Sequence, residues 1–120
     1  MTYNAKNYRK QGGEEWVIGG RVVFLPGAKL MFGDQELKIT RGQHETVTAS
    51  DEVDTGLSVV VSAVANLDAD PTADALFATA SIGDQDGSPD AGSILINTWQ
   101  GDASAASTFG KAVNWIAIGY

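Results

Sequence analysis

The sequence predicts an all-β protein, an antiparallel β-sandwich preceded by an extended, hairpin-rich N-terminal segment. Beyond residue 42, short runs of alternating apolar and polar residues recur along the chain, and alternate side chains of a strand face opposite sides of a sheet. Segments rich in Asp, Gly, Ser and Pro separate these runs, as turns separate antiparallel strands. Helix should be scarce and confined to short turns near residues 71–75 or 103–107.

The first 41 residues differ from the rest and form the first of two expected segments, 1–41 and 42–120. Residues 1–15 are polar, lack a period and read as an extended arm. Three short β-rich runs follow, at 22–25, 30–32 and 37–39, broken by Gly19-Gly20, Pro26-Gly27 and Gly33-Asp34. Strands this short cannot bury a core alone, so we expect them to lie against the body or against a neighbouring chain.

The second segment is expected to hold five longer strands. They are QHETVTAS (43–50), LSVVVSAV (57–64), ALFATASI (75–82), SILINTW (93–99) and AVNWIAIGY (112–120). Strict alternation in the second run places Leu57, Val59, Val61 and Ala63 on one face and Val60 on the other. Turn-rich segments between the runs favour a sandwich or barrel.

The last run is apolar on both faces, which a strand of a monomeric sandwich seldom is. Trp115 alternates with Ile116 and Ile118, so both sides of the strand need a cover. Two accounts remain open: the N-terminal segment covers the strand, or the strand borders a symmetric interface between copies.

Charge is unevenly divided between the two segments. Residues 1–41 carry seven Lys and Arg against four acids, or +3, and residues 42–120 carry one Lys against eleven acids, or −10. Nucleic-acid binding needs clustered cations, so an acidic body argues against it. No apolar run approaches the ~20 residues of a membrane span, and the N-terminus lacks the apolar core of a signal peptide, so we expect neither membrane insertion nor Sec export.

The chain offers little for catalysis or tight metal binding. It has no cysteine and one histidine, His44, which rules out a thiolate site and a histidine cage within one chain. Three copies of His44 at a threefold axis remain an alternative metal site. Asp84, Asp86 and Asp90 begin like a calcium loop, but Leu95 stands where an EF-hand needs Glu. A looser calcium site there stays open, as it does for the similar cluster at Asp68, Asp70 and Asp74.

No nucleophile with a base and an orienting group is recognisable, and the sequence contains neither a Gly-X-Ser-X-Gly elbow nor a phosphate-binding loop. A carboxylate pair for glycoside cleavage is not excluded, because fifteen acids make some pair inevitable. We therefore expect a protein that is not an enzyme and holds no cofactor.

Two stretches resemble known proteins. The opening MTYNAKNYRKQGGEEWVIGGRVVFLPGAKLMF resembles the start of bacteriophage head fibre proteins, in which such a leader precedes a short β segment. The run from SVVVSAVANLD through SILINTW to VNWIAIGY is similar to the H-type lectin sandwich, with a Thr98-Trp99 strand end and a terminal strand from Val113 to Gly119.

The resemblance implies a phage head fibre or capsid decoration protein, located in the virion and made in the bacterial cytoplasm. It would form a homotrimer or a multiple of three, with Trp115, Ile116 and Ile118 buried partly by sister subunits. The N-terminal segment would bind the capsid or another virion protein. Its expected attachment side chains are Tyr3, Tyr8, Trp16, Val22, Phe24, Leu30 and Phe32.

An alternative function is a carbohydrate-binding, lectin-like module for adhesion to the host surface. H-type lectins hold sugar through polar and aromatic side chains at subunit borders. Trp99 is the one candidate stacking platform for a host glycan, although a Trp at a strand end also fits the core or its rim.

Overall fold

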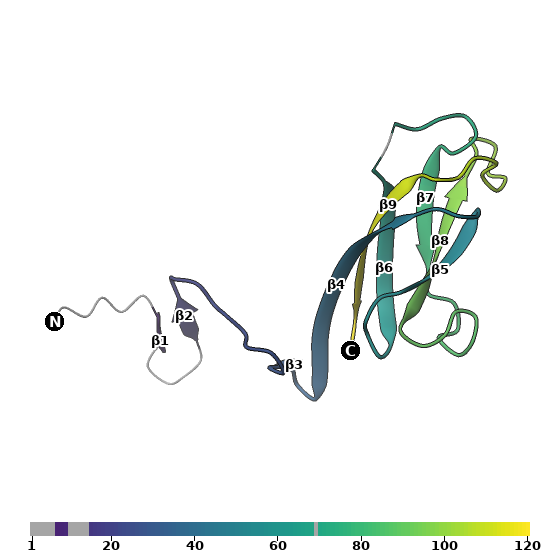
Figure 1. Ribbon diagram of the computed structural model, residues 1–120. Coiled ribbons are helices and arrows are strands. Elements are labelled where there is room, and N and C mark those ends of the chain that lie inside the picture. Colours follow the sequence, from purple (N-terminus) through teal and green to yellow (C-terminus); the bar gives the residue numbers. More distant parts are fainter. Residues whose placement is uncertain (1–6, 10–14, 69) are drawn as a thin grey trace.

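The computed structural model describes residues 7–9, 15–68 and 70–120 (Figure 1). Within these ranges the chain is all-β and contains no helix, which confirms the all-β part of the predicted fold class. The strands are β1 (Asn7–Arg9), β2 (Trp16–Ile18), β3 (Leu30–Phe32), β4 (Gln35–Glu45), β5 (Ser50–Asp54), β6 (Val60–Leu67), β7 (Phe77–Ser81), β8 (Ser93–Trp99) and β9 (Ala112–Gly119).

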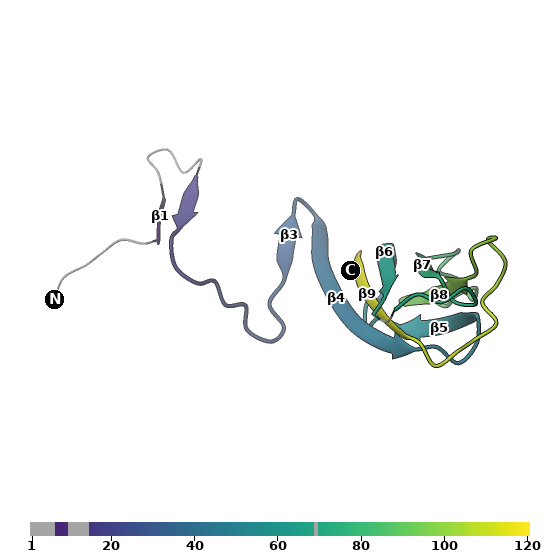
Figure 2. The same ribbon diagram turned by 90° about the horizontal axis from the view of Figure 1, so that it is seen from above.

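Two antiparallel sheets form the body. The first has the strand order β3-β4-β9-β6 and the second β5-β8-β7, while β1 and β2 form a separate two-stranded ladder. Figures 1 and 2 show the two larger sheets lying face to face, as in a sandwich. Between them lie the buried side chains of Leu57, Val60, Ala78, Ile94, Ile96, Val113, Trp115 and Ala117.

The core follows the alternation that the sequence predicted for β8 and β9. Ile94, Ile96 and Val113 are fully buried, and each such side chain stabilises the fold by roughly 1.5–3 kcal/mol through burial alone. The intervening residues of both strands face away from the core. Period-two patterning is therefore a sound guide in these two strands.

β9 is the central strand of the first sheet. It pairs with β4 along Lys38–Glu45 and with β6 from Val60 to Leu67. The carbonyl oxygen of Tyr120 accepts hydrogen bonds from the backbone N–H groups of Ser58 and Val59, at 2.7 and 2.9 Å. The apolar final run is thus a fully paired strand.

A β-bulge in β6 shifts the alternation expected for residues 57–64. The register slips between Val60 and Ser62, so Val61 is the extra residue and lies exposed. Val60 consequently faces the core together with Ala63 and the residues that alternate with it beyond the bulge. Strict alternation had placed Val60 on the opposite face, which is wrong because a bulge adds one residue to one strand only.

One predicted strand, 22–25, is absent, and another, 43–50, is interrupted by a turn. Residues 22–25 form no strand, although their sequence favours one. Residues 46–49 form a turn between β4 and β5, because Asp51 accepts the N–H groups of Val47 and Thr48 at 2.7 and 3.0 Å. β4 also runs without a break across residues 41 and 42, where the sequence suggested a boundary.

Residues 15–34, here called the arm, lead away from the sandwich. In Figures 1 and 2 the chain before β4 extends to one side of the two packed sheets. The molecule measures 63 × 32 × 24 Å, and its radius of gyration is 19.7 Å. A compact chain of this length would have a radius of gyration of about 14 Å.

Gln85 fastens the loop between β7 and β8 to the body. Its side-chain oxygen accepts hydrogen bonds from the N–H groups of Val60 and Gly92, at 2.8 and 2.9 Å. Its side-chain nitrogen donates to the carbonyl oxygens of Ile82 and Ser93, at 2.8 and 2.7 Å. One side chain therefore forms hydrogen bonds with four main-chain groups.

Candidate functional site

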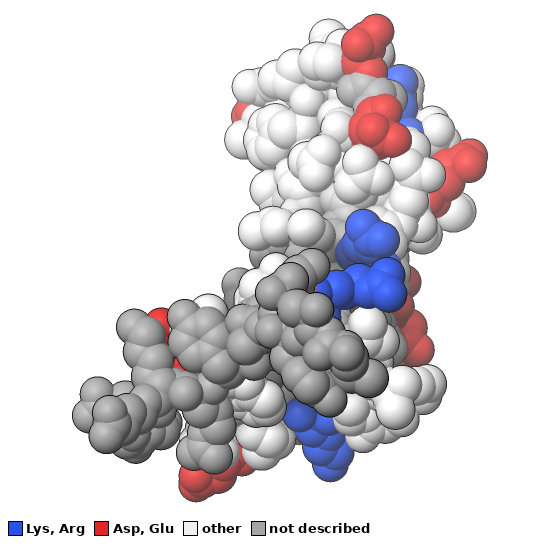
Figure 3. All heavy atoms as spheres, turned by 90° about the vertical axis from the view of Figure 1, so that its left-hand side faces the viewer, with Lys and Arg blue, Asp and Glu red and all other residues white. Residues whose placement is uncertain are grey.

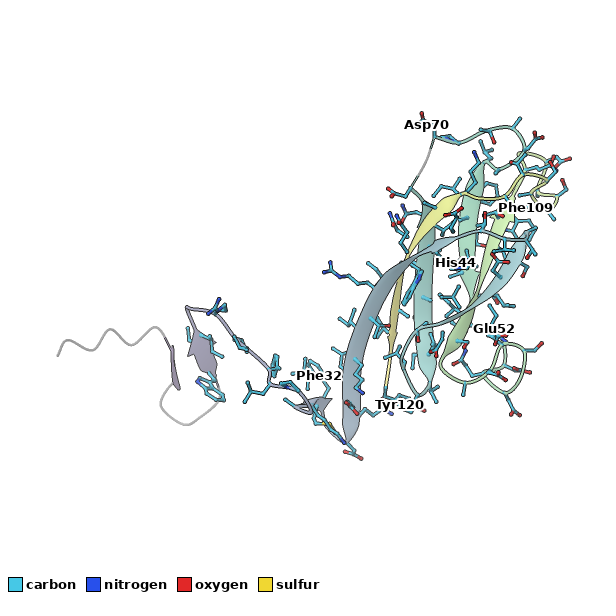
Figure 4. All side chains as sticks on the ribbon, viewed as in Figure 1. Phe32, His44, Glu52, Asp70, Phe109 and Tyr120 are labelled. Atoms are coloured by element: carbon cyan, nitrogen blue, oxygen red, sulfur yellow. The ribbon has the colours of Figure 1, made fainter. Side chains whose placement is uncertain are left out.

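The arm exposes an unusual share of large apolar side chains. Trp16, Phe24 and Phe32 are 70%, 59% and 64% exposed. The others are Ile18, Val22, Val23, Leu25, Leu30 and Met31. Figure 4 shows side chains between β2 and β3 standing clear of the sandwich, with Phe32 at the β3 end. A group of exposed apolar side chains in one segment is typical of a surface where another molecule docks.

Local sequence explains why the arm turns where it does. A turn joins Leu25 to Ala28, whose N–H donates to the Leu25 carbonyl at 2.9 Å, and Gly27 supplies the positive φ of 85° that the turn requires. Gly33, with φ of 66°, supplies the same freedom in the turn between β3 and β4. A hollow of about 280 Å³ lies between these turns, lined by Phe24, Ala28, Leu30, Leu37, Lys38 and Ile39.

The attachment residues expected from the sequence fall into two groups. Trp16, Val22, Phe24, Leu30 and Phe32 all belong to the exposed apolar set of the arm. Tyr3 lies outside the described residues, and of Tyr8 only the backbone, within β1, is described.

A second apolar surface covers part of the first sheet on the side away from the core, here called the outer face. Cross-strand pairing aligns Arg41, Ile116 and Val64 in one row across β4, β9 and β6. Ile39, Ile118 and Ser62 form the next row. The row beyond Arg41 is polar: Gln43 donates to Asn114 at 3.1 Å, and the face is therefore apolar only toward the C-terminal end of β9.

The three residues predicted for a subunit interface divide between the two sides of β9. Ile116 and Ile118 lie on the outer face, 47% and 39% exposed. Trp115 points inward and is only 7% exposed, so it belongs to the core of its own chain. A surface for another subunit can use the two isoleucines but not the indole of Trp115.

Trp99 lies on the solvent side of the second sheet, where it stacks against Phe77 of the neighbouring strand. The ring centroids are 6.5 Å apart and the planes differ by 24°. The indole N–H donates to the hydroxyl of Thr79 at 2.9 Å, which fixes the ring. Sequence reasoning missed Phe77 as its partner, because only the register of β7 against β8 brings the two rings together.

His44 forms a partly buried pair with Asp51, with Nε2 and Oδ2 2.8 Å apart (Figure 4). Burial raises the pKa of the Asp51 carboxyl, but hydrogen bonds from Thr48, Val47 and His44 outweigh burial and hold that pKa below its ordinary value. The pair fastens the turn between β4 and β5. Its role in the described structure is thus to hold a turn.

The acidic loops use their carboxylates on their own backbone. Asp84 accepts the N–H groups of Asp86 and Ser88 at 2.9 and 3.1 Å, and these two bonds lower its pKa. Asp68 accepts from Gln43 at 2.8 Å. Among residues 7–9, 15–68 and 70–120, no three His, Cys, Asp or Glu side chains gather as a metal site would require.

Acidic and basic side chains are unevenly spread over the face of the molecule that carries the arm. Figure 3, which views that face, shows Asp and Glu most densely at its upper end, with others lower down, and Lys and Arg mainly around its middle and lower parts. Arg41 and Lys38 belong to β4, the strand that joins the arm to the sandwich. In the part of the chain that the structure describes, no helix could span a membrane.

Compared with known protein families, with curated proteins and with solved structures, the chain shows no match. Its function has to be argued from its own surfaces, which are the apolar arm, the apolar rows of the outer face and the aromatic pair at Trp99.

Proposed function

We propose that the chain is a non-catalytic structural subunit of a bacteriophage virion, a head fibre or capsid decoration protein. In this proposal it assembles as a homotrimer or a multiple of three, and it is anchored to the capsid or another virion protein by its N-terminal segment. The acidic sandwich then projects outward from the particle.

The observation that carries the proposal is the apolar surface of the arm. A chain that kept Trp16, Phe24 and Phe32 in water would expose three large aromatic side chains within 17 residues, which is unusual for a soluble monomer. Burial on a particle and on sister chains removes this area from water. The outer-face isoleucines Ile116 and Ile118 support self-association in the same way.

The attachment half of the proposal is tested on particles. Virions assembled with the variant Trp16→Ser/Phe32→Ser should carry several-fold fewer copies of the chain than virions with the natural sequence, measured by quantitative mass spectrometry of purified particles. The control is Phe109→Ser, which removes an aromatic ring that is 47% exposed at the opposite end of the sandwich (Figure 4). Unchanged copy number in the arm variant would overturn attachment through the arm.

A carbohydrate-binding role is the second candidate, and the aromatic pair of Phe77 and Trp99 favours it. Sugar rings stack on exposed aromatic faces, and polar side chains beside them fix the orientation. Thr79 and Asn97 lie opposite each other between β7 and β8, next to the pair. A glycan array probed with the full chain tests this role.

The array result should depend on the aromatic pair. Saturable binding that Trp99→Ala abolishes and Phe109→Ala preserves would support the carbohydrate role. An array without signal, or a signal that Trp99→Ala leaves intact, would remove it.

A further inference from the structure

One edge of the first sheet is left open along most of β4. On one side β4 pairs with β9 through Lys38–Glu45, and on the other it pairs with β3 only from Gln35 to Leu37. Thr46, the next residue, donates to the Lys111 carbonyl and accepts from the Gly110 N–H, so its polar groups face the side of β9.

Main-chain groups of successive residues point to alternate edges of an antiparallel strand. Since Thr46 faces β9, the N–H and C=O groups of Ile39, Arg41 and Gln43 face the opposite edge. No strand lies there within the described residues. An open edge of this length is a template for one more strand.

The arm contains a segment that suits such an edge. Val22, Val23, Phe24 and Leu25 are residue types that favour strands, yet they form no ladder, and their side chains are 50–72% exposed. The segment is thus β-prone, apolar and without a strand partner in the described structure.

Pro26 prevents this segment from pairing with β4 of its own chain. The hairpin pairs Leu30 with Leu37, so continuing the same register would set Pro26 opposite Arg41. Arg41 is one of the residues whose main-chain groups face that edge, and proline has no N–H to donate to it. The turn from Leu25 to Ala28 diverts the chain before that point.

We propose that residues 22–25 of a second copy of this chain add to the open edge of β4 as an antiparallel strand, with Val23 opposite Gln43. This register is one residue away from the one that Pro26 blocks. It sets Pro26 opposite Thr40, whose main-chain groups face β9, so no hydrogen bond is lost there.

Charge favours the antiparallel orientation. Arg21 then lies opposite Glu45, and Leu25 lies opposite Arg41. A parallel orientation would instead bring Arg21 to the end of the edge that carries Arg41, where like charges repel. The sequence therefore distinguishes the two orientations of the added strand.

The added strand also brings an aromatic side chain next to Trp115. Phe24 falls opposite Gly42, whose missing side chain leaves room for the ring of Trp115, so Phe24 would lie on the same face of the sheet as that ring. The indole Nε1 of Trp115 has no hydrogen-bond partner among the described residues.

Residues 22–25 supply four of the nine exposed apolar side chains of the arm. The nine exposed apolar side chains of the arm present on the order of 1,000 Å², against the ~800 Å² per partner of a standard interface. This inference rests on the self-association in the proposed function, and it specifies which residues of two copies would be in contact. If each copy adds its residues 22–25 to β4 of the next copy, and the copies are related by rotation, the assembly closes into a ring.

Disulfide cross-linking tests the inference directly, because the natural chain has no cysteine. Two single variants of the full chain, Val23→Cys and Gln43→Cys, are given different tags, mixed and oxidised. Opposite residues of adjacent antiparallel strands lie within disulfide reach. The control pairs Val23→Cys with Val64→Cys, an equally accessible position on β6, about 14 Å from the added strand at three strand spacings.

The expected result is a mixed-tag disulfide formed on the order of tenfold or more faster in the test pair than in the control pair. Equal rates in both pairs, or no disulfide in a protein that light scattering shows to be oligomeric, would overturn strand addition and leave the proposed virion role standing. A single-chain mass at all concentrations would overturn strand addition as well. Particle attachment is measured separately, with variants that leave residues 22–25 intact.

Arg41→Pro provides a second, independent measurement. Its N–H faces the open edge, so proline removes no bond to β9 but blocks a neighbouring strand. The variant should keep the circular dichroism spectrum of the natural chain and lose the 23–43 disulfide. A folded Arg41→Pro chain that still forms this disulfide would contradict the inference.

Discussion

The indole ring of Trp115 lies so close beneath Gly42 that a methyl group on Gly42 would sit 2.6 Å from the ring carbon Cζ2. Gly42 and Trp115 are paired residues of β4 and β9. The absence of a side chain at position 42 is what lets the largest residue of the core lie flat beneath the sheet.

Gly42→Ala is therefore expected to destabilise the fold. Overpacking should lower the free energy of unfolding by about 1–3 kcal/mol, measured by urea denaturation with circular dichroism. Gly20→Ala is the control, since a Cβ at Gly20 meets nothing within 4 Å. If the two variants have the same urea midpoint, the ring of Trp115 does not need the space above it.

Gln85→Glu should loosen the loop between β7 and β8. The substitution removes the amide that donates to the Ile82 and Ser93 carbonyls and sets a carboxylate against them. The free energy of unfolding should fall by about 1–3 kcal/mol. Gln100→Glu, which loses one bond at an exposed site, is expected to stay within about 0.5 kcal/mol of the natural chain. Equal losses in the two variants would argue against Gln85 as the fastening point.

Asp51 should govern part of the acid unfolding of the protein. Its folded pKa is lower than the unfolded value of about 3.9, so its stabilising effect is complete above that value and is lost as pH falls through the folded pKa. Asp51→Asn should reduce stability at pH 7 and flatten the loss of stability below about pH 4.

The measurement is a series of urea titrations from pH 3 to pH 7. Asp70→Asn, a change at an exposed loop position (Figure 4), is the control and should leave the loss of stability at low pH unchanged. If the free energy of unfolding of Asp51→Asn falls as steeply at low pH as that of the natural chain, other carboxylates determine the acid unfolding.

Ile118→Asp should separate the copies without unfolding the chain. Ile118 faces solvent in a single chain, so a charge there costs the monomer little, but it would be buried in an interface on the outer face. Light scattering should show a smaller mass at an unchanged melting temperature. Leu76→Asp, similarly exposed before β7, is the control, and an Ile118→Asp chain of undiminished mass would remove the outer face from the interface.

Sequence reasoning succeeded where one local pattern decides the outcome. In β8 and β9 the alternation of Ile94 and Ile96, or of Val113 and Trp115, is uninterrupted, so the residues that share one face of each strand could be predicted. It failed where a side chain outside the alternating run takes up a main-chain group. Val47 favours a strand, but Asp51 captures its N–H and makes a turn.

The candidate surfaces were predictable to a similar extent. Alternation separated Ile116 and Ile118 from Trp115, but only the structure shows which side faces the core. Residues 22–25 looked like a strand because propensity is local, whereas a strand also needs a neighbour with a matching register. Gln85 gave no signal, because its partner Val60 lies far away in the sequence.

The central position of β9 has a consequence for the order in which the protein folds. β9 follows both of its partners in the chain, and its pairing joins residues as distant as Lys38 and Gly119. During synthesis β4 and β6 must wait, each without its shared neighbour, until β9 has left the ribosome. Such long-range pairing is slow to form, so the first sheet should close only after β9 is available to join β4 to β6.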